Sequence, residues 1–209
     1  MRITPYKIIN FAFTQVLDGI QKIKFLSPAF LCLFENIASS VLRKKIRFSY
    51  DKNINFFVVT EGNKKRIFSN FERGSWLYRN GIIARSEFLF KSYCLEKLSF
   101  SRDDVVIDCG ANYGDLTLKL FEVCEDLQYV GIEPSPNDYE VLTKNVEHKD
   151  AHLIKKALGD KNDKLKFYIC SEKGDSSLVE PPSYTSTVDV EVITLENLVE
   201  SLNLEKIKL

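Results

Sequence analysis

The chain has 209 residues, enough for one well-buried domain or for one domain with an extension. Apolar residues make up 44% and charged residues 28%, which is ordinary for a soluble globular protein. The formal net charge of zero hides a division, because residues 1–100 hold 17 Lys/Arg against 7 Asp/Glu and residues 101–209 hold 12 against 22. A basic half can face an anionic surface, a phosphorylated substrate or a membrane, although such an imbalance is more often a solvated face.

The five cysteines are scattered and odd in number, and no two are spaced as Cys-x-x-Cys. This pattern argues against a disulfide framework and against a zinc site, so no metal is expected. The N-terminus carries a short apolar run without a following small-residue cleavage site, which is not the pattern of an export signal. Reduced thiols and the lack of that signal together predict a cytoplasmic location.

Residues 1–47 are rich in Phe, Ile and Leu with scattered basic residues, and the apolar residues between Ile8 and Ile23 predict one or two amphipathic helices that end near Ser27-Pro28. The most apolar window, 25–42, is interrupted by Pro28, Glu35 and Asn36, so a transmembrane span is not expected. Two roles stay open for such a helix. It packs on the domain or serves self-association, or it lies on a membrane surface backed by basic residues 43–45.

The next segment has the pattern of a β-hairpin and then of a helix. Residues 53–60 and 66–71 are strand-like and are separated by a turn over 61–65. Residues 86–98 have helical spacing, with Ser86 as the expected N-cap. We therefore expect a helical and β-hairpin extension over residues 1–84 and the main domain over residues 85–209.

The main domain is organised around a strand, a glycine turn and a helix. Val105–Ile107 is a short apolar run typical of a strand buried on both faces, and Gly110 and Gly114 bracket the turn that follows. Such a unit belongs to a Rossmann-type α/β fold, in which the ligand sits beyond the carboxyl ends of the strands. The dinucleotide fingerprint Gly-x-Gly-x-x-Gly is missing. Asp108 would repel a pyrophosphate and suits a cationic group such as an ammonium.

Residues 107–114 read Ile-Asp-Cys-Gly-Ala-Asn-Tyr-Gly and resemble the Asp-x-Gly-Ala-Asn-x-Gly motif of FkbM-type methyltransferases, which are class I S-adenosylmethionine-dependent enzymes. The resemblance implies that the backbone over 110–114 cradles the methionine part of S-adenosyl-L-methionine. It also implies that Asp108 faces the ammonium and that Asn112 both shapes the turn and contacts the ligand.

A second strand is expected over 128–132, and Glu133 follows it 25 residues after Asp108. This is close to the spacing at which Rossmann-type folds place an acid on the ribose hydroxyls, and a carboxylate can accept both hydrogens of a cis-diol. Residues 133–145, which begin Glu-Pro-Ser-Pro-Asn-Asp-Tyr, resemble the second motif of the FkbM-type family. Ser135 and Pro136 are the expected N-cap and first residue of a helix.

Residues 152–158 predict a third strand, and the family resemblance places Ala157, Leu158 and Asp160 beside the adenine. Further strands are expected over 165–170 and 187–193, a helix over 195–202, and the start of another strand at 205. The expected fold is a Rossmann-like class I methyltransferase fold with a mostly parallel sheet. In the family an acidic motif, Leu-x-x-Asp-x-Glu-Gly, would follow next, so we expect a chain that is incomplete at its C-terminus.

The resemblance implies methyl transfer from S-adenosylmethionine to a hydroxyl of a sugar or secondary metabolite. No general base is identified. Two alternatives stay open: a catalytically incomplete methyltransferase fold that serves as an interaction module, and a nicotinamide-dependent oxidoreductase. A nucleic-acid partner is not expected, since no binding motif accompanies the basic half, whereas peripheral membrane contact through that half and the oligomeric state stay open. The expected cofactor-binding residues are Asp108, Gly110, Ala111, Asn112, Gly114, Glu133, Ala157, Leu158 and Asp160.

Overall fold

The computed structural model describes residues 26–148, 150–170 and 176–208. The chain divides into two compact units, Met1–Ile82 and Ile83–Leu209. The amphipathic helices predicted before residue 26 lie outside the described residues. Each unit has its own β-sheet structure and its own buried core.

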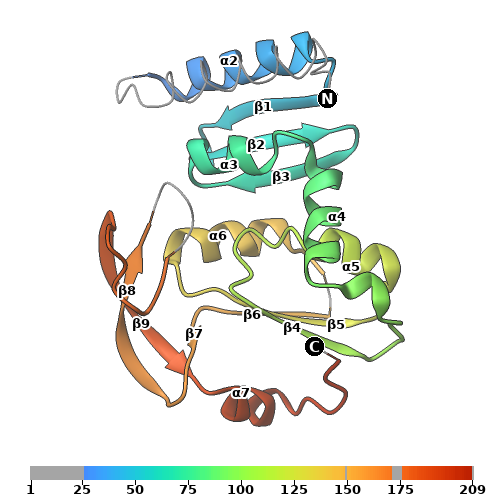
Figure 1. The fold of residues 1–209 in the computed structure, drawn as a ribbon, viewed down its shortest axis with the longest axis vertical. Coiled ribbons are helices and arrows are strands. Elements are labelled where there is room, and N and C mark those ends of the chain that lie inside the picture. The colour runs from blue at the N-terminus through green and yellow to red at the C-terminus, as the bar shows by residue number, and fades with distance from the viewer. Residues whose placement is uncertain (1–25, 149, 171–175, 209) are drawn as a thin grey trace, which may run out of the picture. The chain divides into compact units, whose positions relative to one another are not determined.

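The first unit packs a helix and a short helix with a three-stranded antiparallel sheet of order β1-β2-β3 (Figure 1). The hairpin predicted from the sequence is confirmed, because β2 and β3 pair in antiparallel register across a turn at Gly62. Its core is aromatic, and Phe68 and Tyr78 are fully buried. The elements are α2 (Pro28–Val41), β1 (Ile46–Asp51), β2 (Phe56–Glu61), β3 (Lys64–Phe68) and α3 (Phe71–Leu77).

Strand β1 was not foreseen, since the first strand predicted from the sequence begins at residue 53. The alternation of buried Ile46 and Phe48 with exposed Arg47 is the period-2 pattern of a strand, which a short run next to a helix conceals. The helix holds the edge of β1: the Phe48 N–H donates to Asn36 Oδ1 over 2.7 Å, and Asn36 Nδ2 donates to the Phe48 carbonyl over 2.8 Å. These bonds occupy backbone groups that would otherwise be an open sheet edge.

Helix α4 (Ile82–Ser92) begins four residues before Ser86, so the predicted N-cap is wrong. A residue distant in sequence provides the start instead. Glu61, at the end of β2, accepts a hydrogen bond from the Ile82 N–H through Oε2 over 2.7 Å, and its negative charge suits a helix N-terminus. Gly81, at φ +106°, leaves room for that carboxylate, which would lie 2.7 Å from an added Cβ.

The second unit contains a parallel sheet of order β6-β5-β4. An isolated parallel bridge between Val105 and Ile207 adds the start of a further strand on the other side of β4. The chain thus runs outward from β4 to β6 and then returns to the opposite side of β4, which is the strand order of a doubly wound Rossmann-like sheet. The predicted α/β fold is confirmed. The elements are β4 (Val105–Cys109), α5 (Thr117–Val123), β5 (Gln128–Ile132), α6 (Pro136–Asn145) and β6 (Ala151–Ile154).

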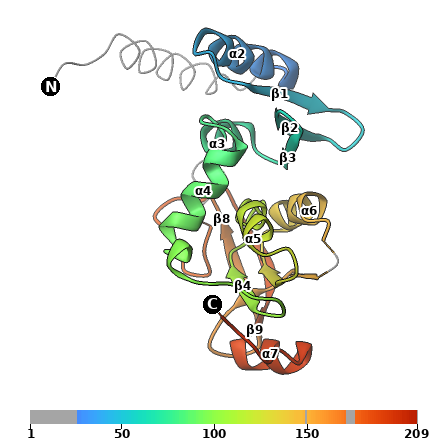
Figure 2. The same ribbon diagram turned by 90° about the vertical axis from the view of Figure 1, so that its right-hand side faces the viewer.

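Helices cover both faces of this sheet (Figures 1 and 2). On one face, Val106 and Tyr129 pack with Leu120 of α5 and Leu142 of α6. On the other face, neighbouring strand residues such as Ile107 pack with Leu198 of α7 (Leu195–Leu202). Because successive side chains of a strand point to opposite faces, the near-continuous apolar runs of β4 and β5 fit a sheet that is buried on both sides.

The predicted third strand is divided in the structure. Strand β6 ends at Ile154, and β7 (Ala157–Leu158) pairs with β9 (Ser186–Ile193) in a second sheet of order β7-β9-β8, whose remaining strand is β8 (Asp163–Ile169). The Lys156 N–H donates to the Ile154 carbonyl over 3.1 Å, a tight turn that redirects the chain between the two sheets. Ala157 consequently packs with Phe167 in a separate apolar cluster.

Candidate functional site

The turn after β4 needs left-handed backbone at three positions. Gly110 has φ +83°, Asn112 has φ +54° and Gly114 has φ +75°. Glycine adopts this region without strain, and asparagine tolerates it better than most residues. An added Cβ at Gly114 would lie 2.5 Å from Val146 Cγ2, so this glycine also lets the turn pack closely against the end of α6. An added Cβ at Gly110 would meet nothing within 4 Å.

The backbone N–H groups of this turn bind within the protein. Those of Gly110 and Ala111 both donate to the Ile132 carbonyl over 2.9 Å, and that of Gly114 donates to the Ala111 carbonyl over 2.8 Å. The Asn112 N–H donates to Glu133 Oε2 over 2.9 Å. A phosphate-binding loop would direct such groups at its ligand instead. The arrangement therefore does not suit a pyrophosphate.

Glu133 joins the turns that follow β4 and β5. Its side chain is 5% exposed, and its Oε1 accepts a hydrogen bond from the Ser135 N–H over 2.8 Å while Oε2 accepts the one from Asn112. Ser135 precedes α6 as predicted, but its hydroxyl makes no capping bond. Each carboxylate oxygen carries two lone pairs, so Glu133 can still accept a hydroxyl hydrogen from a ligand.

Asp108 is half-buried on the face of the sheet that carries Tyr129, and the Tyr129 hydroxyl donates to its Oδ2 over 2.7 Å. Burial raises the pKa of Asp108; the Tyr129 hydrogen bond lowers it, and the charge of Asp115 raises it further. Gly131 makes the contact feasible, because an added Cβ there would lie 2.8 Å from Tyr129 Cε1. A nearby cation would favour the ionised carboxylate.

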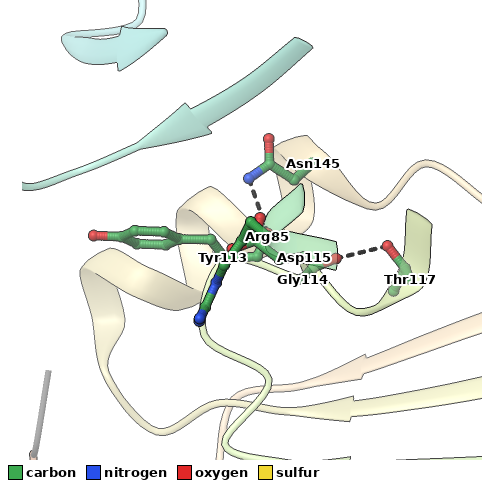
Figure 3. Close-up of polar contacts among 6 residues, drawn as sticks. All are labelled: Arg85, Tyr113, Gly114, Asp115, Thr117 and Asn145. Carbon is green, nitrogen blue, oxygen red and sulfur yellow. Dashed lines mark hydrogen bonds and ion pairs between the residues drawn. The ribbon is translucent and has the colours of Figure 1, made fainter. Parts of the chain in front are cut away.

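The far side of the turn is anchored by side chains from three helices (Figure 3). Asn145 Nδ2 donates to the Tyr113 carbonyl over 2.9 Å, and Thr117 Oγ1 donates to the Gly114 carbonyl over 2.7 Å. Arg85 of α4 pairs with the buried Asp115 at 3.4 Å. Fixing the turn from behind preorganises the surface that it presents to a ligand.

A cavity of about 330 Å³ opens at the carboxyl end of β4 and β5. This volume is at the lower end of the range for small-molecule sites. The cavity brings together five residues predicted from the sequence, which come from the turns after β4 and β5 and from strand β7: Gly110, Asn112, Glu133, Ala157 and Leu158.

The other four predicted residues are not among those that line the cavity. Asp108 lies behind the turn against Tyr129, and Ala111 and Gly114 are buried in the packing of the turn. Asp160 is exposed in the turn between β7 and β8. Their placement fits supporting roles for the first three around the cavity.

One atom of the cavity lining is left without a partner. Asn112 Oδ1 is buried, and no hydrogen bond reaches it from any residue that the structure describes. A buried amide oxygen without a donor is unfavourable, since most buried polar atoms are paired. Here the oxygen belongs to a cavity residue, so a ligand N–H or O–H group can complete it.

The sequence analysis missed several residues at the site. Lys156, Phe167 and Leu178 line the cavity because the second sheet folds beside the first, which no local pattern shows. Tyr129 and Gly131 support Asp108 from within β5. A glycine inside a buried strand is a signal of close approach and could have indicated that contact.

Neither histidine lines the cavity. The His148 ring stacks on Phe121 with centroids 3.9 Å apart, and its Nδ1 accepts a hydrogen bond from the Asp150 N–H. His152 lies within β6 opposite Val130. These positions provide no general base at the cavity.

Comparison with protein families matches residues 108–209 to the methyltransferase FkbM domain. Residues 108–209, just under half of the chain, are similar to the FkbM methyltransferase family. The match begins at Asp108 and includes every predicted site residue. The resemblance inferred from the two motifs is therefore confirmed for this part of the chain.

Solved structures with some similarity include a protein of an antibiotic biosynthesis pathway from Anabaena variabilis ATCC 29413, named as a methyltransferase. It is 20% identical over 34% of this chain and 26% of that chain, with a TM-score of 0.26. Coclaurine N-methyltransferase bound to N-methylheliamine and SAH is 14% identical over 73% of this chain and 44% of that chain, with a TM-score of 0.29. The chain thus spans less than half of these structures. The comparison with curated proteins finds no match.

Proposed function

We propose that the FkbM-type domain binds S-adenosyl-L-methionine in the cavity beyond β4 and β5 and transfers its methyl group to a hydroxyl of a sugar or secondary metabolite. The observation that carries the proposal is the unpartnered Asn112 Oδ1, buried in the lining of a cavity that also holds Glu133. The cofactor offers the complementary donors, namely an ammonium on its methionine part and two hydroxyls on its ribose.

The residues present fit this group chemically. Asn112 Oδ1 would accept a hydrogen bond from the ammonium or a ribose hydroxyl, and Glu133 would accept ribose hydroxyls with its remaining lone pairs. Asp108 would stabilise the positive charge from behind the turn. Ala157 and Leu158 offer an apolar surface for the adenine.

When bound, the cofactor supplies a methyl group that its sulfonium already activates. The residues of this domain then act by holding and orienting the donor, because alignment of the two reactants supplies a large part of the rate gain. The choice of a hydroxyl as acceptor follows from the resemblance to the family.

The turn geometry disfavours the nicotinamide alternative. The N–H groups of Gly110, Ala111 and Asn112 bind the Ile132 carbonyl and Glu133, so a pyrophosphate at this turn would meet the Glu133 carboxylate and no backbone donor from these three residues. The interaction-module alternative shares the fold but predicts no methyl transfer. Turnover assays separate it from the proposal.

Calorimetric titration of S-adenosyl-L-methionine, with NADH as the control ligand, tests the binding site. The informative variant is Asn112→Gly, because glycine keeps the left-handed backbone and removes only the amide. Loss of a hydrogen bond to a charged group should weaken binding roughly tenfold or more. Asn203→Gly is the matched control, since Asn203 also has a positive φ (+49°) at the end of α7.

Equal affinity of the wild-type chain and Asn112→Gly would overturn the assigned site, and tight binding of NADH would overturn the cofactor. Transfer of a radiolabelled methyl group from S-adenosyl-L-methionine to saccharide acceptors then tests the reaction. Cofactor binding by a folded chain that methylates none of the acceptors would favour the interaction module.

A further inference from the structure

Helix α2 exposes a row of large apolar side chains, Phe30, Leu33, Ile37 and Val41, which we call the apolar stripe. Their exposed fractions are 41%, 52%, 47% and 53%. Spacings of three and four residues place them along one side of the helix. The side that packs in the first unit is different and consists of the buried residues Cys32, Glu35, Ala38 and Ser39.

The exposed side of α2 carries no charge. Glu35 is the only Asp, Glu, Lys or Arg in the helix, and it is 3% exposed. Ser40 is exposed, but its hydroxyl donates to the Asn36 carbonyl of the same helix over 2.8 Å. A surface helix normally turns polar or charged side chains to water. An apolar stripe without such groups indicates a surface that is covered in the cell.

The surroundings of the stripe are basic. Residues 26–82 hold ten Lys/Arg against four Asp/Glu, a net charge of +6. Arg43 and Lys45 are exposed and follow Val41 by two and four residues. Lys44, between them, is turned inward, where its Nζ donates to the Arg79 carbonyl over 2.7 Å. Arg43 and Lys45 are therefore the cations beside the stripe that face solvent.

We propose that the apolar stripe, together with Arg43 and Lys45, binds an anionic lipid surface with α2 lying in the plane of the interface. An amphipathic helix binds in this way by burying its apolar side and by attracting anionic headgroups to nearby cations. The exposed cations Arg43 and Lys45 complement anionic headgroups, which favours a lipid surface over an apolar protein groove. A flat orientation also fits the 14-residue length of α2, and no helix among residues 26–148, 150–170 and 176–208 could span a membrane.

Co-sedimentation of the full chain with vesicles tests this surface. Vesicles of phosphatidylcholine with phosphatidylserine should bind the chain, and phosphatidylcholine alone should bind it more weakly. Replacing Leu33 and Ile37 by Gln should reduce binding by about tenfold per residue, since burial of each side chain is lost. The matched control replaces Phe88 and Val179 by Gln. These two residues lie outside α2 and are 62% and 77% exposed, so their replacement should leave vesicle binding unchanged.

The charge contribution has its own variants. Arg43→Gln with Lys45→Gln should reduce binding to the anionic vesicles by about fivefold per cation, and added salt should act in the same direction. Lys91→Gln with Lys97→Gln removes the same charge from exposed positions outside the first unit and should have little effect. Circular dichroism confirms that each variant is folded.

Two results would overturn the proposal. The first is a wild-type chain that binds no vesicles, or that binds them as well after Leu33 and Ile37 are replaced, which would assign any lipid binding to another part of the chain. The second is a dimer, measured by light scattering without lipid, that the same pair of replacements dissociates while vesicle binding is absent. That result would assign the stripe to a second copy of the chain.

Discussion

Replacing Glu133 by alanine should destabilise the second unit even when no cofactor is present. Both oxygens of its buried carboxylate accept backbone hydrogen bonds, one from Asn112 at 2.9 Å and one from Ser135 at 2.8 Å. A residue that acts only on the ligand would leave the stability of the free protein unchanged. The free energy of unfolding without ligand therefore separates the two roles.

The magnitude follows from the two bonds. Hydrogen bonds to a charged group contribute about 1.5–3 kcal/mol each, so the loss of both should lower the free energy of unfolding by roughly 3–6 kcal/mol. That is a large part of the 5–15 kcal/mol typical of a domain. The control is Glu122→Ala, which removes an exposed ion pair with Lys119 and should cost about 0.5 kcal/mol or less.

Urea unfolding followed by far-UV circular dichroism, together with hydrogen exchange of peptides covering 105–135, measures the effect where it is expected. Tryptophan fluorescence reports on the other unit, because Trp76 is the only tryptophan and lies in the first unit. Its transition should be unchanged. A Glu133→Ala chain within about 0.5 kcal/mol of wild type would show that the carboxylate does not hold the two turns together.

Three further predictions concern the same site. Gly114→Ala should destabilise the second unit by about 2 kcal/mol or more, because the added methyl group is strained at positive φ and clashes with Val146. Gly110→Ala should cost only about 1 kcal/mol in the same urea assay, because its added methyl group meets no atom. That methyl group would instead occupy space beside the cavity and weaken cofactor binding. Tyr129→Phe should raise the pKa of Asp108, measured by NMR titration, because it removes the hydrogen bond that favours the ionised form; an unchanged pKa would contradict this contact. Because the pKa of Asp108 is raised in the folded chain, the free energy of unfolding should fall as pH rises through that pKa. Affinity for a cationic ligand should increase over the same pH range, since the carboxylate becomes charged. Asp108→Asn should abolish both pH dependences.

The sequence predicted the central elements of the second unit because each carries a local signal. The apolar runs of β4 and β5, the glycines of the turn and the Ser135-Pro136 start of α6 all depend on neighbouring residues. The start of α4 was not predictable in this way, because Glu61 stabilises it from 21 residues away. The break between β6 and β7 likewise depends on β9, to which the chain returns about 30 residues later.

The residues of the candidate site were likewise predictable only where a local sequence signal marks them. The motifs placed Asn112 and Glu133 at the cavity, since a strand end followed by a turn fixes where such residues lie. They could not show that Glu133 also binds backbone N–H groups, because both partners are set by the packing of two turns. Lys156 and Phe167 entered the lining through the second sheet, whose position beside the first is a tertiary property.

The charge preference of the site follows from the direction of the backbone N–H groups in the turn. A glycine-rich turn after the first strand can bind phosphate when its N–H groups face the ligand. Here the N–H groups of Gly110 and Ala111 bind the Ile132 carbonyl, and that of Asn112 binds Glu133, so the turn presents an unpartnered amide oxygen in their place. Asp108 adds a carboxylate behind that surface. An acceptor in place of backbone donors favours, at this turn, a ligand group that carries N–H or O–H groups and positive charge over a pyrophosphate.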